Sequence, residues 1–210
     1  RKGGSMTIEQ KAAEIRKFCA ANADAARVKK YARYFTEGWD AYGVERKLME
    51  SQRARWLEEW KEELGFEGFL KLGDLLVQSG KYEEASNAIM FAAAFRDEFT
   101  AKTFQRVGKW LDSGFRNWAH TDVSCGEVLA HFLIRKIVPI EAMAEWRNAE
   151  SKWKRRAVPV VLIEALKAGF PVARLLAFIA PMMLDPERMV LQGLGWFLRE
   201  AWKKSPGPTE

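Results

Sequence analysis

The chain has 210 residues, of which 48% are hydrophobic and 30% are charged, and its 34 lysines and arginines against 28 acids give a net charge of +6. This composition excludes an intrinsically disordered chain and is ample for a sizeable core. No apolar run reaches the roughly 18 residues of a membrane-spanning helix, and the N-terminus has no apolar region typical of a secretion signal, so we expect a cytoplasmic protein.

Helix signals follow one another along the chain after residues 1–5, which we interpret as a tag remnant. The first helix begins at Thr7, which forms a capping-box pattern with Gln10. Apolar spacing and glycine breaks predict helices over residues 7–22, 23–35, 44–64, 66–79, 81–95, 97–112, 121–137, 139–149, 152–168, 171–184 and 186–204. We find no run of alternating β-branched residues and predict no strands. The tail, residues 205–210, contains two prolines and a glycine, and we expect it to be flexible.

Short helices joined by tight loops are typical of antiparallel helix pairs. The predicted pairs span roughly 30–40 residues, near the length of a HEAT or armadillo repeat. We therefore predict a single domain of helical repeats over residues 6–204. The repeats are not similar to one another in sequence, so a compact helical bundle is the alternative.

The chemistry-bearing residues exclude several enzyme classes. His120 and His131 are the only histidines, and neither accompanies a serine or cysteine nucleophile motif. Cys19 and Cys125 stand alone, so we expect no disulfide framework, no thiolate zinc site and a reducing compartment. Because a glycine-rich phosphate loop and a carboxylate cluster at metal spacing are also missing, we expect no metal and no nucleotide cofactor.

Basic residues interleaved with tryptophan remain, in segments 117–122, 151–157 and 195–200. Each segment also has an ordinary structural explanation. Its tryptophan can belong to the core, Asp122 can be a helix N-cap, and the cations of 152–156 can form a solvated face. No single segment is evidence of function.

Four segments in order carry a resemblance. They read Tyr34-Phe35-Thr36 with Tyr42-Gly43-Val44, Trp118-x-x-x-Asp122, Ser151-x-Trp153-x-Arg155-Arg156, and Gly195-Trp196-x-Leu198-Arg199-Glu200. Together they resemble the AlkD-like family of DNA alkylation repair glycosylases, which are built of HEAT-like repeats. The resemblance implies an all-α fold, a right-handed α-α superhelix of HEAT-like helical repeats.

The resemblance also implies roles for single residues. Asp122 resembles the family's catalytic carboxylate, and Trp118 and Trp196 resemble the aromatic pair that flanks the sugar and backbone of the damaged nucleotide. Arg156 resembles the arginine that binds the phosphate near the lesion, with Arg155 the alternative if the register differs by one residue. The DNA-binding candidates are Arg156, Arg155, Lys154, Lys152, Arg199 and Lys203, and Lys29, Lys30, Arg33, Arg116 and Lys204 would extend the positive track.

One departure concerns the surroundings of Asp122. The family's stretch is similar to "WWDxVD", whereas this chain reads Trp-Ala-His-Thr-Asp, so His120 stands where the family has its first acid. Relatives of this fold that lack the carboxylate or the aromatics bind DNA without excising bases. This chain keeps both, but the altered surroundings leave the rate and the preferred adduct open.

The residue types suit this chemistry. An N7- or N3-alkylated purine is cationic and leaves without a general acid, so the enzyme has to stabilise positive charge on the deoxyribose. An ionised carboxylate about 4 Å away contributes roughly 4 kcal/mol at an effective dielectric near 20, or about a thousandfold in rate. Asp122 would also orient the attacking water, and a position at or just inside a helix N-terminus favours its charged form.

We therefore predict a monomeric DNA glycosylase of base excision repair that removes cationic N7- or N3-alkylated purines from duplex DNA and is nucleoid-associated when bound. Since phosphate contacts carry no sequence information, binding should be independent of sequence and weakened by salt. Two alternatives stay open. One is a catalytically inactive protein of this fold that binds DNA structures, and the other is a helical solenoid that binds a protein partner.

Overall fold

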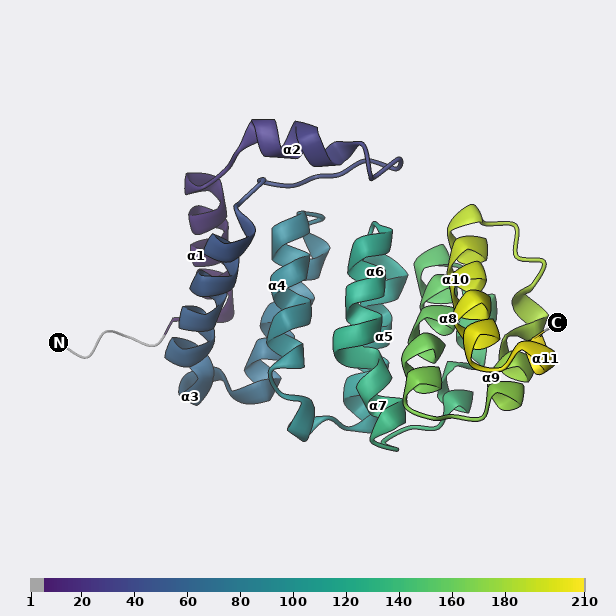
Figure 1. The fold of residues 1–210 in the computed structure, drawn as a ribbon. Coiled ribbons are helices and arrows are strands. Elements are labelled where there is room, and N and C mark those ends of the chain that lie inside the picture. The colour runs from purple at the N-terminus through teal and green to yellow at the C-terminus, as the bar shows by residue number, and fades with distance from the viewer. Residues whose placement is uncertain (1–5, 210) are drawn as a thin grey trace. The chain divides into compact units, whose positions relative to one another are not determined.

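The computed structural model describes residues 6–209, so the predicted tag remnant, residues 1–5, lies outside the described residues. Every regular element within 6–209 is a helix, which confirms the all-α prediction and is the element content of a helical-repeat protein (Figure 1). None of these helices combines the length and the apolar character needed to cross a membrane. The chain divides into two compact units, one ending at Glu98 and one beginning at Phe99. The single domain over 6–204 stays a prediction.

The first unit contains five helical elements. They are α1 (Ile8–Ala21), α2 (Ala25–Ala32), α3 (Arg46–Gln78), α4 (Tyr82–Ala93) and the 3-10 turn η1 (Arg96–Glu98). Helices α1, α3 and α4 pack against one another, whereas α2 lies crosswise beyond the ends of α1 and α3 (Figure 1). The predicted capping box of Thr7 and Gln10 is confirmed at the start of α1.

The two helices predicted on either side of Gly65 are the two parts of α3. Gly65 has φ +55° and ψ −173°, a backbone conformation that residues other than glycine rarely adopt. This residue interrupts the helical geometry of α3. The core of this unit is aromatic: Trp56 stacks on Trp60 with ring centroids 5.7 Å apart, and Phe69 packs on Phe91 at 5.0 Å. Glycine therefore sets the direction change that brings both parts of α3 to the core.

The second unit is organised around one central helix. Its elements are α5 (Ala101–Ser113), α6 (Trp118–Ser124), the π-helix η2 (Cys125–Leu129), α7 (Ala130–Ile134), the 3-10 turns η3 (Ile140–Met143) and η4 (Glu145–Asn148), α8 (Lys152–Lys167), α9 (Val172–Ile179), the 3-10 turn η5 (Ala180–Met182), α10 (Arg188–Lys204) and α11 (Pro206–Thr209). Helix α8 is buried along most of its length and contacts α5, α6, α7, α9 and α10. A side chain on α8 can thus reach several helices at once.

The helix predicted over 139–149 was wrong in type. The segment forms two successive 3-10 turns, and its buried side chains Ile140, Met143 and Trp146 recur every three residues. This spacing matches the three residues per turn of a 3-10 helix. Trp146 fixes the segment by stacking on Phe104 at 4.9 Å.

The end of the chain also differs from the expectation. Residues 206–209 of the expected flexible tail form the helical turn α11, which contacts α9 and α10. Pro206 is its first residue, where the fixed φ of proline suits a helix and the missing N–H costs nothing. The Thr209 hydroxyl donates a hydrogen bond to the Ser205 carbonyl at 2.8 Å. Glu210 lies outside the described residues.

Candidate active site

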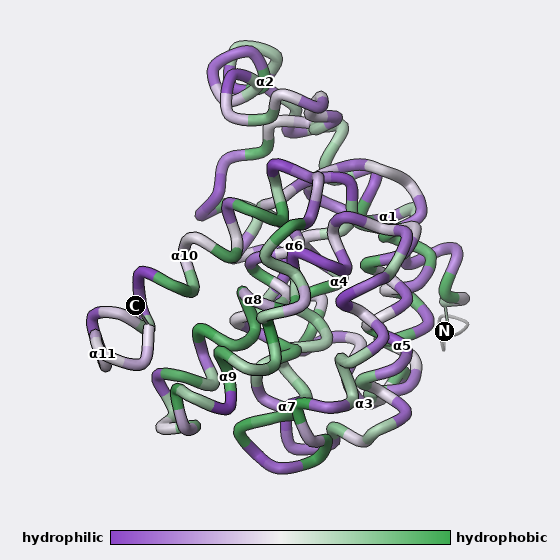
Figure 2. The backbone as a smooth tube through the Cα atoms, turned by 90° about the vertical axis from the view of Figure 1, so that its right-hand side faces the viewer, coloured by the Kyte–Doolittle hydropathy of each residue, from purple (hydrophilic) through white to green (hydrophobic). Residues whose placement is uncertain are grey.

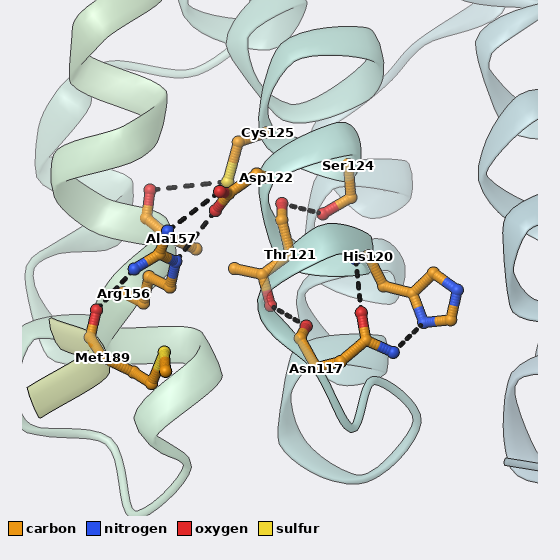
Figure 3. A network of polar contacts seen from close by, with 9 residues as sticks. All are labelled: Asn117, His120, Thr121, Asp122, Ser124, Cys125, Arg156, Ala157 and Met189. Carbon is orange, nitrogen blue, oxygen red and sulfur yellow. Dashed lines mark hydrogen bonds and ion pairs between the residues drawn. The ribbon is translucent and has the colours of Figure 1, made fainter. Parts of the chain in front are cut away.

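Asp122 lies inside helix α6 and does not cap it. The helix begins at Trp118, and Asn117 is its N-cap, with the Asn117 Oδ1 accepting from the His120 backbone N–H at 2.9 Å. The predicted start at Thr121 or Asp122 was therefore wrong by three or four residues. Since the cap is another residue, the Asp122 carboxylate is available for contacts with neighbouring helices (Figure 3).

The Asp122 carboxylate forms a two-pronged ion pair with Arg156 of α8. Arg156 Nε donates to Oδ1 and Nη2 donates to Oδ2, both at 2.9 Å. The side chains of Arg156 and Asp122 are only 7% and 15% exposed. Such parallel N–H···O bonds hold a carboxylate in one orientation, and the residual exposure leaves an edge of Asp122 open.

Arg156 joins three helices. Its Nη1 donates a hydrogen bond to the Met189 carbonyl in the first turn of α10 at 2.6 Å. One turn further along α10, Gly193 lies against the same arginine, because a Cβ placed there would be 3.4 Å from the Arg156 Cγ. Close approach of α10 to α8 thus seats the arginine that holds Asp122 of α6.

A π-helix begins three residues after Asp122. The Thr121 hydroxyl donates to the Asn117 carbonyl at 3.2 Å, and the Ser124 hydroxyl donates to the Thr121 carbonyl at 2.8 Å. At the first π-helical residue, Cys125 Sγ donates to the Ala157 carbonyl of α8 at 3.6 Å. Burial, with the nearby Asp122 charge second, raises the pKa of the Cys125 thiol well above its ordinary value. This neutral thiol helps fix α6 against α8, and π-turns of this kind are frequent at functional sites.

The structure separates the three candidate tryptophans into two kinds. Trp153 is buried and belongs to the core. Trp118 and Trp196 are half-buried. Trp118 is one turn before Asp122 on α6, and Trp196 is one turn after Gly193 on α10, so each lies on the same helix face as a residue that contacts Arg156. The two tryptophans with predicted functional roles are the two that keep an exposed part.

A family model described as DNA alkylation repair enzyme matches residues 15–209. The chain belongs to this family. A comparison with curated proteins found no match. Membership in the DNA alkylation repair family supports a role as a repair enzyme with DNA as the substrate.

The other predicted DNA contacts of this repair-family protein fall into two groups. Arg155 is turned away from Arg156: its Nε pairs with Asp185 at 2.7 Å, and its Nη1 donates to the carbonyls of Ala149 and Glu150. Lys154 pairs with Asp112 at 2.6 Å and is mostly buried. Both cations therefore brace the protein around the start of α8.

The second group contains two exposed cations and one half-buried cation. Arg199 and Lys203 of α10 are exposed and both contact Glu200, at 3.3 and 3.1 Å. Lys152 lies over the Trp153 ring, with its Nζ 5.1 Å from the ring centroid. Contact of these cations with DNA stays a prediction.

Sequence reasoning missed three residues that build this site: Asn117, Met189 and Gly193. Asn117 is a strong N-cap residue type and could have been found. Met189 contributes through its carbonyl, which leaves no signal in the sequence. Within residues 6–209, no group of three or more His, Cys, Asp or Glu side chains is arranged to hold a metal ion.

Proposed function

We propose that this protein is a DNA glycosylase that removes cationic N7- or N3-alkylated purines from duplex DNA. The observation that carries the proposal is the Asp122 carboxylate, fixed by Arg156 and still partly exposed. A fixed carboxylate stabilises positive charge that develops on the deoxyribose as the glycosidic bond lengthens, without reorganising during the reaction. Asp122 would also orient the water that attacks the sugar.

The ion pair changes the expected size of this effect. With the carboxylate about 4 Å and the guanidinium about 8 Å from the developing charge, opposing interactions of roughly 4 and 2 kcal/mol leave about 2 kcal/mol at a dielectric near 20. This corresponds to about thirtyfold in rate. Arg156 thus reduces the field of Asp122 while it fixes the orientation of the carboxylate.

A phosphate near the lesion would restore part of that field. A guanidinium carries five N–H donors, and the contacts to Asp122 and Met189 use three of them. We assign the remaining N–H groups on Nη1 and Nη2 to this phosphate. Its negative charge would offset the positive charge of Arg156, and the exposed parts of Trp118 and Trp196 would add cation–π stabilisation of the sugar.

The position of His120 supports a retained active site. This side chain is buried, its Nδ1 lies 3.0 Å from the Asn117 Nδ2, and its ring packs against Phe115 at 5.6 Å. His120, which replaces the family's first acid, therefore contacts the N-cap residue Asn117 and stabilises the first turn of α6. The departure in sequence leaves the Asp122–Arg156 pair intact.

The experiment compares release of 7-methylguanine and 3-methyladenine from methylated duplex DNA by wild type and Asp122→Asn. We expect release to slow about a hundredfold, because the variant loses both the charge and the water-orienting group. Glu145→Gln is the matched control, since it removes an exposed carboxylate of the same unit. Unchanged release by Asp122→Asn would contradict the mechanism.

A second candidate is a catalytically inactive protein that binds DNA structures. It is favoured by one observation, namely that both oxygens of Asp122 already accept hydrogen bonds from Arg156. This candidate predicts base release at the background rate together with tight, salt-sensitive binding of branched or damaged duplexes.

A further inference from the structure

Half of the protein's net charge lies in fifteen residues. Residues 25–39, which we call the arm, comprise α2 and the loop after it, and they hold four cations against one acid. The net charge of +3 in the arm compares with +6 for the whole chain. The cations of the arm are Arg27, Lys29, Lys30 and Arg33.

The arm projects from its unit. Helix α2 contains no buried residue, and Figures 1 and 2 both show it beyond the ends of its neighbouring helices. Lys29 and Lys30 are exposed and form no ion pair within the part of the chain that the structure describes. A cationic helix without a buried residue is not explained by the core of its own unit.

Buried contacts hold the arm at its base. The Glu83 carboxylate accepts backbone N–H bonds from Tyr42 at 2.9 Å, Gly43 at 2.7 Å and Val44 at 3.2 Å. Gly43 has φ +82°, and a Cβ there would lie 2.4 Å from the Asp24 carbonyl oxygen, so only glycine fits. The chain entering α2 and the chain leaving the arm are thus fixed to each other.

Aromatic rings brace the loop of the arm. Phe35 and Trp39 stack with centroids 5.2 Å apart, and Tyr82 of α4 meets both rings edge-on. Tyr31 of α2 packs edge-on against Trp39 at 6.1 Å. The arm is therefore a braced element that keeps its cations in place.

The exposed tyrosines of the arm organise these cations. Lys30 Nζ lies 5.5 Å from the Tyr31 ring centroid, and the Arg33 guanidinium lies 4.8 Å from the Tyr34 ring. Arg33 Nη2 also donates to the Tyr34 hydroxyl at 2.8 Å. Arg27 is ion-paired with Asp24 at 3.6 Å, whereas Lys30 and Arg33 lie over aromatic rings, which leave their positive charges available to a polyanion.

We propose that the arm is a separate docking site for the phosphate backbone of duplex DNA, independent of damage and sequence. We identify the polyanion as DNA because the chain belongs to a DNA alkylation repair family. Lys29, Lys30 and Arg33 would each neutralise a phosphate, which releases condensed counterions and raises affinity. The arm adds affinity for undamaged DNA and takes no part in the chemistry at Asp122.

The test measures binding of the full chain to an undamaged duplex over a range of salt concentrations. The arm variant carries Lys29→Gln, Lys30→Gln and Arg33→Gln, and we expect the slope of log affinity against log salt to fall by about 2–3. The control carries Lys61→Gln, Lys71→Gln and Arg55→Gln, which remove the same charge from exposed positions of α3. We expect the control to change the slope by less than about 1.

Two results would overturn the proposal. Equal slope changes for both variants would mean that only net charge matters, and unchanged affinity of the arm variant would point to a protein partner. Lys29→Arg with Lys30→Arg should keep wild-type affinity, which separates lost charge from lost structure. No base is released from an undamaged duplex, so this binding measurement does not depend on catalysis at Asp122, and failure of the glycosylase proposal and failure of this one are distinguishable.

Discussion

Each unit of the protein contains a largely buried carboxylate, Glu83 in the first and Asp122 in the second, and the two differ in which groups donate hydrogen bonds to them. Glu83 is 6% exposed and accepts three N–H bonds from the backbone of residues 42–44. Asp122 is 15% exposed and accepts from the side chain of Arg156 on another helix. Asp122 is thus the more exposed of the two, and the donors separate them further.

The donors show what each carboxylate can do. Backbone N–H groups belong to the segment they hold, so Glu83 fixes a loop with three of its roughly four acceptor positions. A guanidinium orients Asp122 from one side and leaves its open edge to solvent. The identity of the donors is therefore the better guide to a functional carboxylate, and four measurements test this difference between the two units.

The largest expected effect is on the stability of the first unit, which contains Glu83. Glu83→Ala leaves three backbone N–H groups without their acceptor, and we expect the free energy of unfolding to fall by about 4 kcal/mol. Urea denaturation measures the change, with Glu58→Ala on an exposed face of α3 as the control. A loss below about 1 kcal/mol would show that water replaces the carboxylate.

The Asp122–Arg156 pair should respond as a pair. Arg156→Ala leaves the carboxylate without its partner, and we expect a loss of about 3 kcal/mol. In an Asp122→Ala background the same substitution should cost at least about 1 kcal/mol less, because the two residues share the interaction. Simple additivity in this double-mutant cycle would contradict the pairing.

Local sequence signals predicted much of this architecture. The capping box at Thr7 and the break at Gly65 are encoded within a few residues, and the structure confirms both. The start of α6 could not be fixed this way, because Asn117, Thr121 and Asp122 are all good N-cap residues within six positions. In the structure Asn117 is the N-cap, because its side chain contacts the backbone and the ring of His120, and that ring packs against Phe115.

The site required information about which helix faces meet. Arg155 and Arg156 are adjacent and chemically identical, but successive helical residues point about 100° apart. Arg156 consequently reaches Asp122, while Arg155 reaches Asp185. The resemblance to a family selected Arg156, whereas spacing alone could not.

Gly193 tests whether close helix packing holds the arginine. Gly193→Ala puts a Cβ 3.4 Å from the Arg156 and Pro159 side chains, the near limit of ordinary van der Waals contact. This contact offsets the better helix propensity of alanine, and we expect stability near that of the wild type in thermal or urea unfolding. Gly195→Ala on the same helix meets nothing within 4 Å and should gain up to about 1 kcal/mol from better helix propensity. Equal effects of the two substitutions would remove the packing argument.

The smallest expected effect is on the pH dependence of the stability of the first unit, which contains Cys19. Burial, and next the charges of Glu83 and Glu84, raise the pKa of the Cys19 thiol from 9.0 to about 12. The folded state therefore resists losing this proton, so the contribution of Cys19 to stability is complete below pH 9 and is lost as the pH rises toward 12. Between pH 8 and pH 10 we expect the thiol to account for about 1 kcal/mol of lost stability. Cys19→Ala should be less sensitive to this pH change by the same amount, and an identical pH profile would mean that the thiol is not shielded in the folded protein.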